Sequence, residues 1–134
     1  PELVMHSVSV RRQTPEPDNF ISVKVINLHK IPHRIASQLP LHLVVAALRR
    51  MYDDKERRKY KVLVVCPDGA TFTGQFLVMA ALMDMISLLN EADVFYVTKM
   101  MKAKHPGFIS SLIQYMHVYE VVDTICQQLN TAAL

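Results

Sequence analysis

The chain has 134 residues, of which 51% are hydrophobic and 20% charged, and its net charge is +3. This length and composition suit one globular unit with a single core, and no fixed-period repeat points to a solenoid. Many of the cations lie in residues 49–61, where acids are interleaved with them. We interpret that run as a solvated surface and expect neither a nucleic-acid nor a lipid partner.

The chain contains two cysteines, Cys66 and Cys126, far apart in sequence, and neither a signal peptide nor an Asn-x-Ser/Thr site. This pattern predicts a reducing compartment and hence a cytoplasmic location. The longest apolar run, residues 76–83, is too short to cross a bilayer, so we expect no membrane span. The six histidines are scattered without paired cysteines or carboxylates, and we therefore expect no metal site and no cofactor.

The N-terminal residues predict two strands. His6–Arg12 is the first, and the turn-rich residues 13–19 follow it. Phe20–Leu28 alternates polar and apolar residues, which is typical of a half-buried antiparallel strand. Together the two strands predict a hairpin with a loop.

Four segments have the apolar spacing of helices. The first contains Leu41, Val44, Leu48 and Met51 on one side, with Pro40 in its first turn. The others run from about residue 73 to 89, from 92 to 104, and from 111 to 129, and the third of the four is stopped by Pro106.

Between the first two helices, Tyr60–Val65 predicts a buried strand that ends at Cys66. Two glycines and a helical pattern follow at once, so the sequence predicts a strand, a tight loop and a helix N-terminus. Backbone N–H groups and the positive end of a helix dipole meet at such a junction, and this arrangement suits an anion.

Residues 65–74 read Val-Cys-Pro-Asp-Gly-Ala-Thr-Phe-Thr-Gly. This run resembles the signature of protein tyrosine phosphatases, His-Cys-x-x-Gly-x-x-Arg-[Ser/Thr]-Gly, with Val65 in place of the histidine and Phe72 in place of the arginine. Four positions match, namely Cys66, Gly69, Thr73 and Gly74. The remnant of the phosphate-binding loop would consist of Cys66, Pro67, Asp68, Gly69, Ala70, Thr71, Phe72, Thr73 and Gly74.

The departures from this signature fall on the groups that do the chemistry. In the family, the arginine holds the phosphate through two parallel N–H bonds, and Phe72 has neither a donor nor a charge. Pro67 removes one backbone N–H from the loop. Asp68 would place a carboxylate beside the intended anion.

The resemblance continues on both sides of the signature. Upstream, Asn27–His33 is similar to the family's His-[Tyr/Phe]-x-x-Trp-Pro-Asp pattern, but it keeps only the proline and has His33 in place of the general acid. Downstream, residues 105–119 are similar to Arg-Pro-x-[Met/Leu]-Val-Gln-Thr-x-x-Gln-Tyr-x-Phe-x-Tyr. There Gln114 is retained and Ser110 replaces the glutamine that helps position the hydrolytic water in the family.

The resemblance implies an α/β (α+β) fold, with a mixed sheet covered by helices and the Cys loop between a strand and a helix. It further implies that residues 1–134 are the C-terminal half of a single partial domain, without its N-terminal half. The lost chemical groups resemble those of pseudophosphatases, including the membrane-distal second domains of receptor-type phosphatases. We therefore expect an inactive interaction or regulatory module whose partner is the missing half or another phosphatase domain, with weak phosphotyrosine or anion binding.

Two alternatives remain open. Cys66 could still act as a nucleophile or a redox-sensitive thiol, against the interpretation that it is an inert cysteine at a strand end. The spacing of residues 69–76 also resembles a nucleotide-binding Gly-x-x-x-x-Gly-Lys-[Ser/Thr] loop, although Gln75 replaces the lysine and Phe76 the hydroxyl residue.

Overall fold

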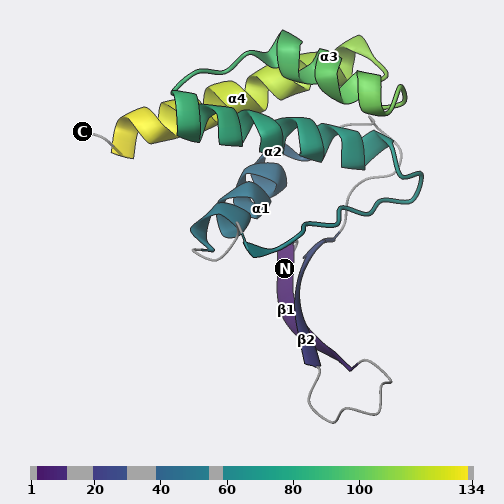
Figure 1. Ribbon diagram of the computed structural model, residues 1–134. Coiled ribbons are helices and arrows are strands. Elements are labelled where there is room, and N and C mark those ends of the chain that lie inside the picture. The colour runs from purple at the N-terminus through teal and green to yellow at the C-terminus, as the bar shows by residue number, and fades with distance from the viewer. Residues whose placement is uncertain (1–2, 12–19, 30–38, 55–58, 133–134) are drawn as a thin grey trace. The chain divides into compact units, whose positions relative to one another are not determined.

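The computed structural model describes residues 3–11, 20–29, 39–54 and 59–132 (Figure 1). The chain divides into two compact units, Pro1–Ile31 and Pro32–Leu134. Among the described residues, the first unit holds two strands and the second holds four helices. The predicted α/β class, with strands and helices both present, is confirmed.

The N-terminal unit is a two-stranded antiparallel sheet of β1 (Leu3–Arg11) and β2 (Phe20–Leu28). The strands pair from Leu3 with Leu28 to Arg11 with Phe20, which confirms the predicted hairpin, although β1 begins at Leu3 rather than His6. Because side chains alternate between faces along a strand, this register places two apolar cross-strand pairs on one face, Val8 with Val23 and Val10 with Ile21. All four side chains are exposed.

The C-terminal unit contains α1 (Leu41–Asp53), α2 (Thr71–Leu89), α3 (Val94–Lys104) and α4 (Leu112–Ala132), and all four predicted helices are confirmed. α2 contacts each of the other three, and α1 also contacts α4. In the view of Figure 1, α3 lies above α2 and α1 below it. The fully buried apolar side chains of this core are Val44, Leu48, Val78, Met79, Leu82, Val118 and Val121.

Local signals in the sequence explain where these helices begin and end. Pro40 precedes α1, and its carbonyl accepts from the N–H groups of Leu43 and Val44 at 3.0 and 3.1 Å. Asn90 ends α2 in the left-handed conformation, with φ of 55°, which asparagine tolerates better than most residues. The Asp93 carboxylate accepts from the Tyr96 N–H at 2.8 Å and caps α3.

The predicted buried strand before Cys66 is wrong. Residues 61–66 have no regular secondary structure, and Leu63 and Val65 are 86% and 79% exposed. A strand requires a hydrogen-bonded neighbour, and in the part of the chain that the structure describes the only sheet is the pairing of β1 with β2. That sheet is purely antiparallel, so the parallel pairing expected of a mixed sheet does not occur among the described residues.

By length and composition α2 could cross a membrane, with a mean hydropathy of 1.7. The core helix of a globular unit can be equally long and apolar, and three other helices contact α2. Its buried residues also include the polar side chains of Thr73 and Gln75. We therefore interpret α2 as the central helix of this unit.

Candidate functional site

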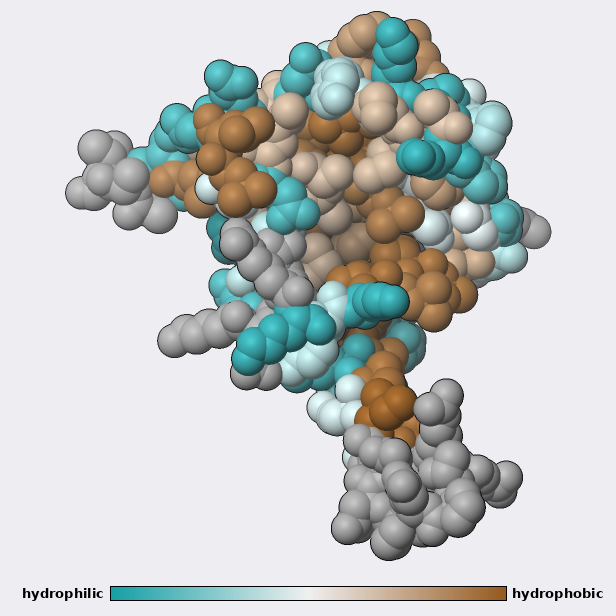
Figure 2. All heavy atoms as spheres, in the orientation of Figure 1, coloured by the Kyte–Doolittle hydropathy of each residue, from teal (hydrophilic) through white to brown (hydrophobic). Residues whose placement is uncertain are grey.

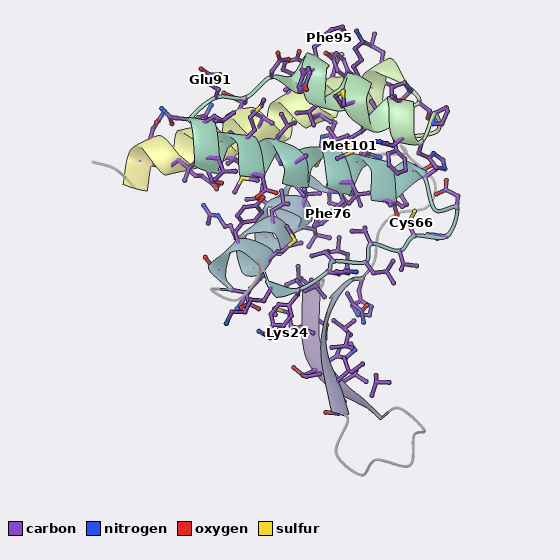
Figure 3. The ribbon with its side chains drawn as sticks, in the orientation of Figure 1. Lys24, Cys66, Phe76, Glu91, Phe95 and Met101 are labelled. Atoms are coloured by element: carbon purple, nitrogen blue, oxygen red, sulfur yellow. The ribbon has the colours of Figure 1, made fainter. Side chains whose placement is uncertain are left out.

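The Cys66 loop, defined as residues 66–74, follows the irregular segment 61–65 and includes the first turn of α2 (Figure 3). The Gly69 N–H donates to the Cys66 carbonyl at 3.2 Å and closes a tight turn. Gly69 has φ of 67°, a backbone conformation that favours glycine. The structure thus brings all nine residues of the predicted loop remnant together at a helix N-terminus.

The Cys66 thiol lies at the first turn of α2. Its Sγ accepts a hydrogen bond from the Thr73 hydroxyl at 3.0 Å and faces the Thr73 N–H at 3.4 Å. Cys66 is half-buried, and both it and Cys126 are free cysteines. The Thr73 side chain, which matches the signature, therefore donates directly to the sulfur.

The Asp68 carboxylate folds back onto the N–H groups of its own loop. Its Oδ1 accepts from the N–H groups of Ala70 and Thr71 at 3.0 and 2.9 Å, and from the Cys66 thiol at 3.2 Å. Its Oδ2 accepts from the Thr71 hydroxyl. The Thr71 hydroxyl, followed by the two backbone N–H groups and the thiol, holds the pKa of the Asp68 carboxyl well below its usual range. An internal anion thus uses donors that an external anion would need.

Among the residues that the structure describes, none adds a cation to the loop around this carboxylate. Pro67 has no N–H, and Phe72 is a half-buried aromatic side chain in the first turn of α2. Two arginines have described side chains, Arg49 and Arg50, and both belong to α1. Arg49 bonds the Gln128 side chain of α4, and neither arginine bonds the Cys66 loop in the described part of the chain.

Gln114, the downstream glutamine, is fully buried in the first turn of α4. Its Oε1 accepts from the Ser110 N–H at 2.8 Å and lies 3.4 Å from the Ser110 hydroxyl. This geometry orders the turn that leads into α4. His33, predicted at the position of the general acid, lies outside the described residues.

One side chain that the sequence did not single out organises the segment before α4. The Lys102 ammonium donates to the carbonyls of Pro106, Phe108 and Ile109 at 3.2, 2.9 and 3.0 Å. Ile109 has φ of 48°, so Lys102 secures a turn whose backbone is rarely occupied by β-branched residues. A lysine at the end of a helix is common, and no sequence pattern distinguished this one.

The nucleotide-binding spacing has no support in this geometry. Gln75, which stands where a phosphate-binding lysine would be, is fully buried, and its Nε2 donates to the Thr71 carbonyl at 2.9 Å. Among the described residues, no three His, Cys, Asp or Glu side chains form a group that could hold a metal ion.

Comparison with known proteins assigns the sequence to a family. The sequence model described as protein-tyrosine phosphatase matches residues 2–124, and the chain belongs to the protein-tyrosine phosphatase family. No solved structure gives a significant match.

Three of the relatives that the chain matches are receptor-type. It is 25% identical over 114 residues to receptor-type tyrosine-protein phosphatase C from Homo sapiens, which covers 85% of this chain and 8% of that protein. It is 28% identical over 91 residues to receptor-type tyrosine-protein phosphatase U from Gallus gallus, which covers 68% of this chain and 6% of that protein. The rat form of phosphatase C is 31% identical over 71 residues, covering 53% of this chain and 6% of that protein. The chain thus spans less than a tenth of the length of these relatives.

Proposed function

We propose that this chain is a catalytically inactive phosphatase-like module that acts through protein–protein interaction in the regulation of signalling. The observation that supports this proposal most strongly is the Asp68 carboxylate, which accepts from the Ala70 and Thr71 N–H groups at 3.0 and 2.9 Å. A phosphate would need those donors, and it would meet a negative charge at the same place.

The substitution at Phe72 acts on a different part of the reaction. An arginine that stabilises a phosphoryl-transfer transition state contributes roughly 10³ to 10⁵ in rate, and a phenyl ring contributes none of that stabilisation. A general acid contributes roughly 10² to 10⁴ in rate, and His33 in its place would forfeit that contribution. These factors are not multiplied, because groups that act as a unit are not additive.

For the partner, we propose the remainder of a phosphatase domain or a second phosphatase domain. The segment 61–65 supports this proposal, because the side chains of Val62, Leu63 and Val65 are exposed on the surface. Its residues favour a strand, and it has no sheet partner among the described residues. The face of Val8, Val10, Ile21 and Val23 is a second exposed apolar surface. Figure 2 shows apolar surface in brown on the side of the molecule seen in Figure 1. Because the matched relatives are receptor-type, we further propose that the module lies on the cytoplasmic side of a membrane receptor.

Residual anion binding at the Cys66 loop belongs to the same proposal, and we expect it to be weak because Asp68 competes for the donors. Titration of phosphate or tungstate against the amide resonances of residues 69–74 tests this point. Millimolar or weaker binding in the wild type and tighter binding in Asp68→Ala would support the competition. Micromolar phosphate binding in the wild type would contradict it.

A second candidate function is a residually active or redox-sensitive cysteine-dependent phosphatase. The hydrogen bond from the Thr73 hydroxyl to Cys66 Sγ at 3.0 Å favours it, since such a donor stabilises a thiolate. The Asp68 carboxylate, 3.2 Å from the same sulfur, opposes it by accepting a hydrogen bond from the thiol and by repelling a thiolate. The rate at which iodoacetamide modifies Cys66 at neutral pH separates the two, with Cys126 as the internal reference. A rate similar to that of Cys126 supports the inactive module, and a much higher rate supports the second candidate.

A further inference from the structure

Leu39 is a buried residue whose two backbone groups are both bonded by side chains. It is 2% exposed and lies just before Pro40 and the first turn of α1. A residue that precedes proline is disfavoured in the helical conformation, so Leu39 cannot be satisfied by an extension of α1. A buried N–H or C=O without a partner is costly, and Leu39 therefore needs donors and acceptors from elsewhere.

Gln75 of α2 supplies the acceptor. Its Oε1 accepts from the Leu39 N–H at 3.3 Å, while its Nε2 donates to the Thr71 carbonyl at 2.9 Å. Gln75 is 0% exposed. A single buried amide thus joins the backbone before α1 to the first residue of α2, and that residue also bonds the Asp68 carboxylate of the Cys66 loop.

His117 of α4 supplies the donor. Its Nε2 lies 2.6 Å from the Leu39 carbonyl, and the ring is 5% exposed. A carbonyl only accepts, so Nε2 must carry a proton in this contact. The other ring nitrogen, Nδ1, lies 3.1 Å from the exposed Glu120 carboxylate on the same helix.

We propose that His117 and Gln75 form a clasp on the Leu39 backbone, and that this clasp ties the start of α2, and with it the Cys66 loop, to α4. Leu39 is the junction, because its N–H is held from α2 and its C=O from α4. His117 is a positioning residue in this arrangement, and loss of its Nε2 donor releases both Leu39 and the turn that begins α2. The clasp is a conformational link between two helices and is independent of whether Cys66 is reactive.

Two matched variants of the 134-residue chain test the link. His117→Gln keeps an N–H donor at a position similar to Nε2. The side chain of His117→Asn is one methylene shorter, so its amide does not reach the Leu39 carbonyl. When the buried Leu39 carbonyl lacks its donor, the backbone around Leu39 should open locally about 5- to 150-fold more often. We therefore expect Leu39 amide hydrogen exchange to accelerate by that factor in His117→Asn, with rescue in His117→Gln. The Val121 amide, in the middle of α4, is the control for global unfolding.

The same pair tests whether the link reaches the loop. Alkylation of Cys66 should become several-fold faster in His117→Asn than in His117→Gln, and Cys126 should not change. Faster Leu39 exchange without a change at Cys66 would overturn the proposed tie to the loop. Equal behaviour of the two variants, or equal acceleration at Leu39 and Val121, would overturn the clasp.

A measurement on the wild type needs no variant to fold. Imidazole 15N chemical shifts report which ring nitrogen carries a proton, and we expect Nε2 of His117 to be protonated. An Nε2 without a proton would overturn the proposal, because that nitrogen could not donate to Leu39.

Discussion

At the scale of single residues, the orientation of Asp68 was the point that the sequence could not provide. The resemblance identified the nine positions of the Cys66 loop, and it raised the prospect of a carboxylate beside the anion site. Only the structure shows that Asp68 accepts from the loop's own N–H groups and from the Cys66 thiol. The side chain could equally have pointed into solvent, and nothing in a one-dimensional motif specifies that choice.

The low pKa of Asp68 makes a prediction about the pH dependence of stability. A carboxyl group whose folded-state pKa is depressed stabilises the fold above its unfolded pKa of about 3.9 and loses that contribution as pH falls through the folded pKa. We expect Asp68→Asn to lower the free energy of unfolding at pH 7 and to lower it by less at pH 3. Urea unfolding of both proteins at the two pH values measures this. An equal difference at pH 7 and pH 3 would contradict the assignment.

Phe72 leads to a second prediction at this scale. We expect Phe72→Arg alone to restore no turnover of p-nitrophenyl phosphate, because Asp68 would still use the N–H groups of Ala70 and Thr71 and would pair with the new guanidinium. The assay compares this variant with Phe72→Lys, which adds the charge without the planar fork. Turnover in Phe72→Arg well above that of Phe72→Lys would show that the arginine was the only missing group.

At the scale of elements, the close approach of α2 to the turn before α4 depends on Gly74. A Cβ built at this position would lie 2.7 Å from the Cγ and Cδ1 atoms of the buried Phe108 ring. We expect Gly74→Ala to destabilise the fold by about 1–3 kcal/mol, because the ring and its neighbours must shift. Urea unfolding measures the cost.

A matched glycine controls for the backbone. A Cβ at Gly69 meets no atom within 4 Å, but the φ of 67° strains an alanine there. Gly69→Ala should therefore lower the free energy of unfolding by about 1–2 kcal/mol, whichever residue occupies position 108. Replacing Phe108 by alanine should therefore reduce the additional cost of Gly74→Ala and leave that of Gly69→Ala unchanged. Additive effects for the pair Gly74 and Phe108 would refute the steric explanation.

The helices and the hairpin were predictable from the sequence, and the segment before Cys66 was not. The four helices and the hairpin were predictable because their apolar periodicity and their end signals, such as Pro40 and Asn90, are local. The absence of a strand before Cys66 was not predictable, because a strand depends on a neighbouring strand elsewhere in the chain. Residues 61–65 have the composition of a buried strand, but no neighbouring strand pairs with them among the described residues. The Leu39 contacts were missed as well, since they join residues 36 and 78 positions apart.

At the scale of the whole molecule, exposed apolar residues in segment 61–65 predict self-association. We expect Leu63→Lys and Val65→Lys to lower the weight-average mass in sedimentation velocity without changing the unfolding midpoint, because both side chains are almost fully exposed. Leu88→Lys, at the C-terminal end of α2, is the control for an exposed leucine outside the segment. An equal decrease in mass for Leu88→Lys would show that general hydrophobicity, and not this segment, causes the association.

The family itself was predictable from residues 65–74 together with the flanking patterns, and the match over residues 2–124 agrees with that resemblance. Its chemistry is tested most directly by p-nitrophenyl phosphate turnover, measured side by side for the wild-type protein and Cys66→Ser. Our account predicts that both proteins give the same background rate. A wild-type rate well above background that Cys66→Ser abolishes would contradict it.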